Sequence, residues 1–235
     1  MAKVYLSVVM PALNEELDIG KTLRYVRSIE DVEIIVVDGG SKDNTVKIAK
    51  KYADKVIVSH GGTIGKARNI GAGYAKGEVI LFLDADTVPH VEFFDKLKTI
   101  FSRDKKVVGL GCVIMPRRLS FFETLFFYLL NFLVHLSVQL RRPCIAGSCV
   151  AYRRSSFVKA TGFDEERAAS EDQDFSIKIS KFGSVIFLPR IVTYTSSRRL
   201  RVLGFFGLLV NWLGTTFNFL LGIKTKKYAL THSKA

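Results

Sequence analysis

Short apolar segments alternate with helix-forming segments in the first part of the chain, and this alternation restricts the folds that the chain can adopt. Apolar residues recur at helical spacing in residues 15–28 and 43–53. Strands that alternate with helices in this way predict a parallel sheet with right-handed βαβ connections. We expect the first strand to end at Pro11. The predicted strands are residues 4–10, 32–37, 55–58 and 79–83.

Polar side chains follow three of these strands at the point where each strand ends. Residues 11–15 read PALNE, Asp38 precedes two glycines, and Asp84 and Asp86 follow the fourth strand. Ligands of open parallel sheets bind beyond the carboxyl ends of the strands. We therefore expect the three aspartates to lie on one rim of one sheet.

Asp84 and Asp86 are a candidate metal site. The two residues are two positions apart, so in an extended segment their side chains point to the same side. Mg²⁺ or Mn²⁺ takes oxygen ligands and commonly bridges protein carboxylates to substrate phosphates. The alternative is a helix N-cap cluster before Pro89, which would need only one aspartate.

Length, charge and cysteine content set broad limits. The 235 residues, 48% of them hydrophobic, suffice for one large α/β domain or two small ones. Residues 1–116 carry 17 basic and 15 acidic side chains, whereas residues 117–235 carry 18 and 7, which predicts an anionic partner for the second half. Three cysteines at no zinc-like spacing indicate reduced thiols in a cytoplasmic compartment. The N-terminus does not have the pattern of a signal peptide.

Five segments together resemble a known family. They read, in order, SVVMPALNEE, IIVVDGGSKDNT, GKARNIGAGYAKGEVILFLDADT, GFDEE and SEDQDFSIKI. In this order, over about residues 4–190, they resemble the inverting family-2 glycosyltransferases of the GT-A fold. The resemblance implies a Rossmann-like, mostly parallel α/β sheet flanked by helices. It also implies transfer of a sugar from a nucleotide diphosphate sugar to an acceptor, with Mg²⁺ or Mn²⁺.

The resemblance also implies roles on the donor side, carried over by position. Pro11, Asn14 and Glu15 would flank the nucleotide. Asp38 would meet the base, and Arg68 would meet the base or the diphosphate.

Metal and acceptor roles follow in the same way. Asp84 would lie by the ribose or the metal, Asp86 would bind the metal, and Asp172 would be the general base. A divalent cation stabilises the charge that develops on a leaving diphosphate. Lys66, two residues before Arg68, would add positive charge near the diphosphate. The alternative interpretation is that Lys66 lies on an exposed helix face.

The segment SEDQD, residues 170–174, has a second interpretation as an acidic helix N-terminus. Both interpretations hold together, because a helix N-terminus keeps a carboxylate ionised and ready to act as a base. No Gln-x-x-Arg-Trp motif follows Asp174, which argues against a processive polysaccharide synthase. No histidine clearly completes the metal site, and His232 is the weak candidate.

Two apolar segments with basic ends lie in the second half, at residues 119–140 and 202–223. The first has a polar stripe, and the second has a face of small and polar residues suited to packing on protein. Both are long enough to cross a bilayer. If only the first crossed, Asp172 and Asp86 would lie on opposite sides of the membrane. We therefore favour helices that lie in an anionic interface, although residues 202–223 could span; the alternative is buried helices at a dimer interface.

The sequence thus predicts a membrane-associated glycosyltransferase on the cytoplasmic face, built from four segments. Its acceptor would be a hydroxyl of a lipid or lipid-linked glycan. The nearest alternative is a polyprenyl-phosphate sugar synthase; a nucleotidyltransferase is less favoured, and no nucleic acid partner is expected. The segments are a nucleotide-sugar-binding half (1–116), an amphipathic helix (117–142), an acceptor-side catalytic part (143–197), and a membrane-associated helix with a basic tail (198–235).

Overall fold

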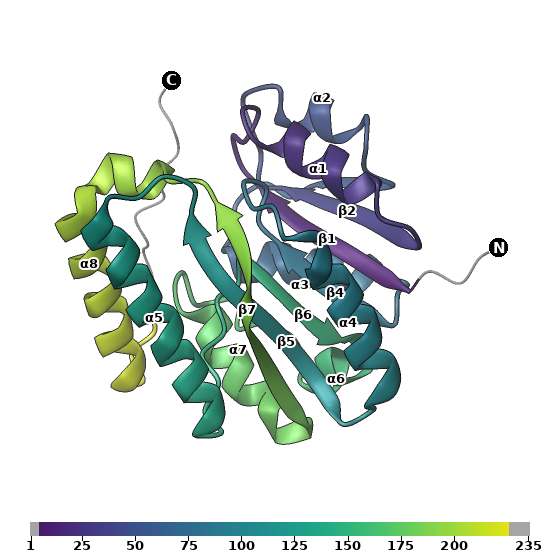
Figure 1. Cartoon of the computed structure of the whole chain (residues 1–235). Helices are drawn as coiled ribbons and strands as arrows, with labels where there is room; N and C mark the ends of the chain where they lie inside the picture. The colour runs from purple at the N-terminus through teal and green to yellow at the C-terminus, as the bar shows by residue number, and fades with distance from the viewer. Residues whose placement is uncertain (1–4, 226–235) are drawn as a thin grey trace.

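A computed structural model describes residues 5–225 and contains a seven-stranded sheet in the order β3-β2-β1-β4-β6-β5-β7 (Figure 1). Strand β6 runs antiparallel to both of its neighbours, and the other pairs are parallel. The mostly parallel α/β architecture expected from the sequence is therefore confirmed. The strands are β1 (Leu6–Ala12), β2 (Val32–Asp38), β3 (Lys55–Val58), β4 (Val79–Leu83), β5 (Val107–Pro116), β6 (Cys149–Arg153) and β7 (Ser184–Thr195).

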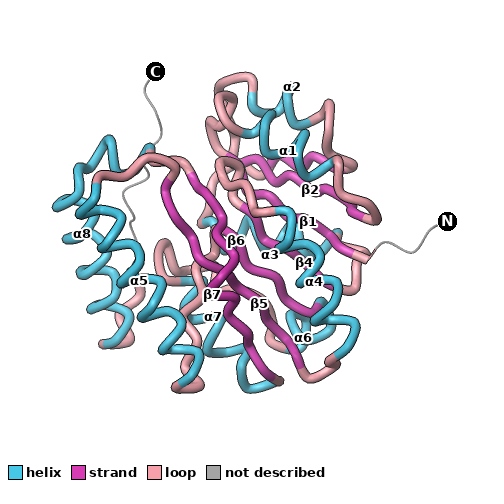
Figure 2. Tube along the Cα trace, viewed as in Figure 1, coloured by secondary structure: helices cyan, strands magenta, loops and turns pink. Residues whose placement is uncertain are grey.

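Helices cover both faces of the sheet (Figures 1 and 2). Helices α1, α2 and α4 pack on one hydrophobic cluster, and α3, α5, α6 and α7 pack on the other. In β1, Val8 and Met10 belong to the first cluster and Val9 to the second, as the alternation of side chains requires. The helices are α1 (Ile19–Arg27), α2 (Thr45–Ala49), α3 (Ile64–Tyr74), α4 (Val91–Arg103), α5 (Phe121–Gln139), α6 (Arg154–Lys159), α7 (Glu171–Ile179) and α8 (Arg198–Leu220), with a 3-10 turn η1 (Ser180–Phe182).

The end of β1 differs from the expectation. Pro11 does not end the strand but lies within it, opposite Val37 of β2. On the other side of β1, the pairing with β4 stops at Val9 and Phe82. The missing N–H of Pro11 therefore lies where β4 no longer needs a donor, and the strand continues to Ala12.

Helices α5 and α8 lie side by side at one edge of the molecule (Figure 1). The ring of Phe126 stacks on Trp212, with centroids 6.2 Å apart, and Phe205 meets Phe126 edge-on at 5.0 Å. Gly207 and Gly214 are exposed, so the expectation that the small residues of α8 form its packing face is wrong for these two. Aromatic side chains make the contact instead, because they bury more apolar surface than glycine.

Helix α3 depends on a glycine for its close approach to the sheet. A Cβ at Gly71 would overlap Val9 Cγ1 and lie 3.2 Å from Val37 Cγ2, both in buried strands. We expect Gly71→Ala to destabilise the fold by about 1–3 kcal/mol, because side chains added to a well-packed core force shifts in the backbone. Equilibrium unfolding in urea measures this loss.

Gly73→Ala is the matched control, because no atom lies within 4 Å of a Cβ at that position in the same helix. It should be neutral or stabilising by up to about 1 kcal/mol, the difference in helix propensity between the two residues. Equal destabilisation by both substitutions would contradict the packing argument.

Candidate active site

The loops after β1, β2 and β4 meet at one rim of the sheet. Ala12 pairs with Asp38 at the ends of β1 and β2, and β4 lies on the other side of β1. Asp38 and the pair Asp84 and Asp86 therefore share one rim, as the strand pattern predicts. A single rim with several carboxylates is a place where a cation or a polar ligand can bind.

The segment from Asp84 to Asp86 is a turn and is not extended, which corrects the sequence expectation. The amide of Thr87 donates to the carbonyl of Asp84 at 3.0 Å, and this hydrogen bond closes the turn. The two carboxylates consequently have different partners. Asp84 accepts a hydrogen bond from Arg68 at 3.1 Å, whereas Asp86 accepts from the hydroxyls of Thr87 and Thr195, each at 3.2 Å.

Asp86 lies in an excess of negative charge. Burial raises its pKa to about 6, and the charges of Asp84 and Glu15 add to the rise, while Arg198 opposes it. A divalent cation would relieve this repulsion, and the surrounding donors are oxygen atoms, which suit Mg²⁺ or Mn²⁺.

Within residues 5–225, no cluster of three or more histidine, cysteine or acidic residues could hold a metal. Asp84 and Asp86 would supply at most two protein ligands. That number fits Mg²⁺, which usually keeps water and substrate phosphates as its other ligands. His232 lies outside the described residues.

Glu15 forms an ion pair that the sequence analysis did not foresee. Arg198, the first residue of α8, donates to both carboxylate oxygens of Glu15, with Nη1 and Oε2 2.8 Å apart. Arg198 Nη2 is also 4.0 Å from Asp86 Oδ2. The sequence assigned Arg198 to the basic flank of an apolar segment, and no local signal in the sequence places it on this rim.

A buried guanidinium connects the rim to α7. Arg68 is 2% exposed and donates to Glu171 at 2.7 Å, to Asp84 at 3.1 Å and to the carbonyl of Gly147 at 3.0 Å. Burial and the charge of Asp172 raise the pKa of Glu171 to about 7, although Arg68 opposes the rise. With these contacts, Arg68 acts as a link between elements; direct contact with a nucleotide stays a prediction.

Asp172 lies in the first turn of α7, as the sequence predicts. Its Oδ2 accepts a hydrogen bond from the amide of Gly147 at 2.7 Å, and its Oδ1 accepts from the amide of Gln173 at 2.8 Å. Gly147 thus touches Asp172 through its N–H and Arg68 through its carbonyl. A Cβ on Gly147 would lie 2.7 Å from Arg68 Nη1, so this close approach requires glycine.

The loops after β1 and β2 are joined by hydrogen bonds. Asp38 is fully buried, and its carboxylate accepts from the amides of Gly40 and Ser41 at 2.9 and 2.8 Å. Asn14, at φ 52°, accepts from the amide of Lys42 at 2.9 Å. Both residues therefore shape the loops that border the rim.

Pro11 and Lys66 are both half-buried. Pro11 is half-buried within β1. Lys66 is half-buried at the start of α3, where its aliphatic chain lies against Gly62. Its ammonium makes no ion pair with any residue in the described part of the chain, so it is available to an anion.

Comparisons with known proteins agree with this geometry. Residues 7–160 match the family described as "Glycosyl transferase family 2". A dolichyl-phosphate beta-glucosyltransferase, ALG5A of Trichomonas vaginalis, is 35% identical over 132 residues, which are 49% of this chain and 41% of that protein. The probable glycosyltransferase YdaM of Bacillus subtilis is 29% identical over 211 residues, covering 80% of this chain and 50% of the relative.

A solved structure shares the fold. The mannosyltransferase PcManGT from Pyrobaculum calidifontis, in complex with GDP-Man and Mn²⁺, superposes with a TM-score of 0.72 at 18% identity, covering 94% of this chain and 65% of that one. The strand order and this similarity define a GT-A type of α/β fold. The chain belongs to glycosyl transferase family 2, because the model of this family matches more than half of its residues. It spans about two fifths of the length of the first curated relatives.

Proposed function

We propose that the protein is an inverting glycosyltransferase that moves a sugar from a nucleotide diphosphate sugar to a hydroxyl of a lipid or lipid-linked glycan. The observation that carries this proposal is the chain of contacts from Asp84 through Arg68 and Gly147 to Asp172. It joins a carboxylate at the donor rim to a carboxylate at a helix N-terminus. Family membership supports glycosyl transfer, and the names of the relatives, which include dolichyl-phosphate glucosyltransferases, support a lipid or lipid-linked acceptor.

Asp172 is the general base in this proposal. An inverting displacement needs a base on the side of the sugar opposite the leaving diphosphate, where it accepts the proton of the attacking hydroxyl. Two backbone amides donate to the Asp172 carboxylate, and the start of α7 adds the positive end of a helix dipole. These contacts orient the carboxylate.

Donor binding is assigned to the residues that follow β1, β2 and β4 and to the start of α3. Asp84 and Asp86 would hold Mg²⁺ or Mn²⁺, which supplies positive charge to the leaving diphosphate when it is bound. Lys66 adds a cation that no carboxylate of the described chain neutralises. Pro11, Asn14, Glu15 and Asp38 border the space proposed for the nucleotide.

A polyprenyl-phosphate sugar synthase is the second candidate. The first three relatives carry the name dolichyl-phosphate beta-glucosyltransferase, and in that reaction class the acceptor is a phosphate. A phosphate is already ionised and needs no general base, whereas a sugar hydroxyl does. The presence of an oriented carboxylate at Asp172 therefore favours the hydroxyl.

Helices α5 and α8 are the proposed membrane-binding surface. Both are long and apolar enough to cross a bilayer, and little of each is buried in the protein. Large exposed side chains include Phe121 at 78%, Phe122 at 77% and Phe206 at 77%. An apolar surface of this extent marks an interaction site, and basic residues at the helix ends suit an anionic membrane.

The ends of α8 favour a helix that lies on the membrane. At its start, Arg198 binds Glu15, and just after its end Lys224 binds Asp164 at 3.0 Å and Glu166 at 2.6 Å. A spanning helix would carry its two ends to opposite sides of a bilayer about 30 Å thick. Both ends instead contact the same α/β domain, which supports monotopic attachment, proposed for the cytoplasmic face.

The first prediction from the proposed function tests the metal. Asp86→Ala should abolish metal-dependent transfer and weaken Mn²⁺ binding in the presence of a nucleoside diphosphate, because it removes a ligand. The fold should be kept, because the substitution removes a buried carboxylate whose charge is repelled by Asp84 and Glu15. Electron paramagnetic resonance of Mn²⁺ measures the binding, and exposed Asp95→Ala on α4 is the control. Near-normal metal-dependent activity in Asp86→Ala would refute the metal assignment.

The second prediction tests the base. Asp172→Asn keeps the size of the side chain and removes its basicity, so transfer to a hydroxyl should fall by roughly 10²-fold or more. Affinity for the nucleotide sugar should change little, because the donor groups lie elsewhere on the rim. Transfer rate and donor affinity are measured in the same variant. If both survive, Asp172 is not the base and a phosphate acceptor is favoured.

The third prediction tests membrane attachment. The protein should sediment with anionic vesicles, and high salt should weaken this binding without eliminating it, because only the electrostatic part is screened. Phe206→Ser should weaken it by about tenfold, the effect of withdrawing one phenylalanine from the apolar phase. Phe182→Ser, at a 47% exposed position outside α5 and α8, is the control. No sedimentation at low salt would exclude the membrane proposal.

A further inference from the structure

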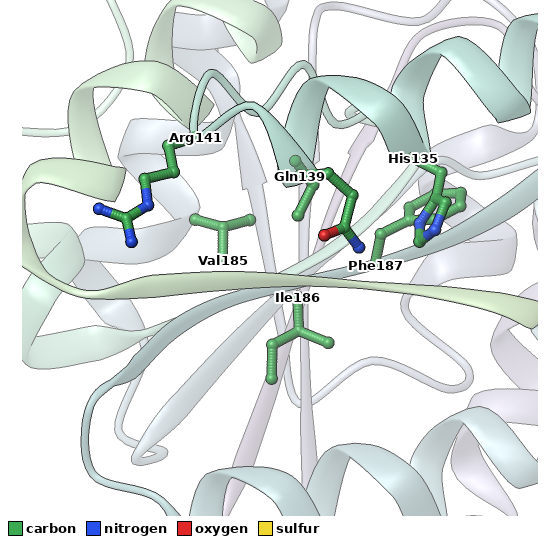
Figure 3. Close-up of a pocket in the computed structure, with 7 residues that line it drawn as sticks. His135, Gln139, Arg141, Val185, Ile186 and Phe187 are labelled. Atoms are coloured by element: carbon green, nitrogen blue, oxygen red, sulfur yellow. The ribbon is translucent and has the colours of Figure 1, made fainter.

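A cavity of about 430 Å³ lies between the last turns of α5 and the first half of β7 (Figure 3). No residue of the proposed active site lines it. Its lining residues are His135, Val138, Gln139, Arg141, Val185, Ile186 and Phe187.

The cavity is remote from the catalytic rim. Phe187 pairs with Gly111 in the middle of β5, whereas Thr195, which binds Asp86, pairs with Pro116 at the end of that strand. A bulge in β7 between Leu188 and Val192 shortens this path, so the two levels are separated by the five residues of β5 from Gly111 to Pro116, roughly 17 Å at the usual rise of a strand. A ligand in this cavity therefore does not occupy the donor site.

The polar side chains of the lining are a cation and two hydrogen-bonding groups, with no acidic residue among them. Figure 3 shows Arg141, Gln139 and His135 along β7 on the side of the strand that faces α5. Arg141 is exposed and makes no ion pair with any residue from 5 to 225. Its guanidinium is thus free to bind an anion.

His135 adds an unsatisfied polar atom. Its ring lies against Phe187, with centroids 5.8 Å apart, and its Nδ1 is buried without a hydrogen-bond partner in the described chain. Buried polar atoms are nearly always paired, so an orphan beside a cavity indicates a missing partner. The atom has almost no accessible surface in the described side-chain position, so rotation of the ring would bring it to a ligand oxygen in the adjacent cavity.

We propose that this cavity binds the phosphate ester of an anionic phospholipid headgroup. Arg141 can grip phosphate oxygens with two N–H groups, Gln139 can donate from its amide, and His135 Nδ1 can pair with a further oxygen. Val138, Val185 and Phe187 form an apolar wall for the carbon atoms of the headgroup. The inference goes beyond glycosyl transfer, and its choice of a lipid rests on the membrane attachment proposed above.

A lipid is the favoured source of the phosphate because of where the cavity lies. It opens beside the C-terminal end of α5, the helix that carries a row of exposed phenylalanine and leucine side chains. A membrane that contacts this row would bring headgroups to the cavity mouth. A soluble phosphate ester has the same chemistry, and the experiment separates the two sources.

The test compares two adjacent arginines. Arg141 lines the cavity, and Arg142 is also exposed but does not line it. Arg141→Asn keeps a residue that tolerates the observed φ of 59° and removes the charge. Binding to phosphatidylcholine vesicles with and without phosphatidylglycerol is measured by sedimentation for Arg141→Asn, Arg142→Asn and the uncharged change Gln139→Ala.

We expect Arg142→Asn to weaken binding to anionic vesicles by about fivefold, the effect of one surface charge. Arg141→Asn should weaken it at least fivefold further, and Gln139→Ala about threefold, in keeping with the loss of one hydrogen bond. Binding to neutral vesicles should be equal for all. Donor hydrolysis should match the parent protein in each variant, which shows that the fold is intact.

Glycerol 3-phosphate without vesicles is the second arm, read by thermal unfolding. One outcome would overturn the lipid as the ligand. If glycerol 3-phosphate stabilises the parent protein but not Arg141→Asn, and Arg141→Asn binds vesicles no more weakly than Arg142→Asn, the ligand is a soluble phosphate ester. Equal losses for the two arginine variants, with no effect of Gln139→Ala in either arm, would overturn the site itself.

Discussion

The buried guanidinium of Arg68 is the interaction on which the arrangement of the rim depends. Removing an arginine from water is costly unless its charge and its N–H groups are satisfied. Two carboxylates and a carbonyl accept from its two terminal nitrogens, while Nε is buried without a partner in the described chain. The three acceptors come from the turn after β4, the start of α7 and the loop before β6. Because these three segments must converge on one side chain of α3, the charge of Arg68 fixes where Asp84 and Asp172 lie relative to each other.

Much of this architecture is visible in the sequence, and the parts that are not have a physical reason. Strand β4 begins and ends where its apolar run does, since a fully buried strand needs apolar side chains on both faces. The turn after Asp84 was missed because alternation predicts an extended chain, whereas a backbone hydrogen bond closes it. The ion pair of Glu15 and Arg198 was missed because its partners are 183 positions apart, and such a contact exists only once the fold brings them together.

Helix α8 connects the two sides of the site through its ends. Arg198 meets the donor rim, while Lys224 binds Asp164 and Glu166, and the amide of Ala168 donates to the carbonyl of Thr225 at 2.8 Å. That second contact region leads directly into α7 and Asp172. Between the ends, α8 is interrupted at Gly204, where φ is 68°, so residues 198–203 take a different direction from the rest. The helix proposed to meet the membrane therefore has its geometry set by the site.

The basic excess of the second half consequently serves two purposes. Part of it faces outward beside the apolar surface, and part of it neutralises carboxylates: Arg198 acts on Glu15 and Asp86, and Lys224 on the loop before α7. The rim carries Glu15, Asp84 and Asp86 close enough to raise a pKa, so it needs cations whether or not a metal is bound. Since one of these cations begins α8, displacement of that helix would leave the negative charge of the rim less balanced. If α8 meets the membrane as proposed, membrane contact and the charge balance of the rim are coupled through Arg198.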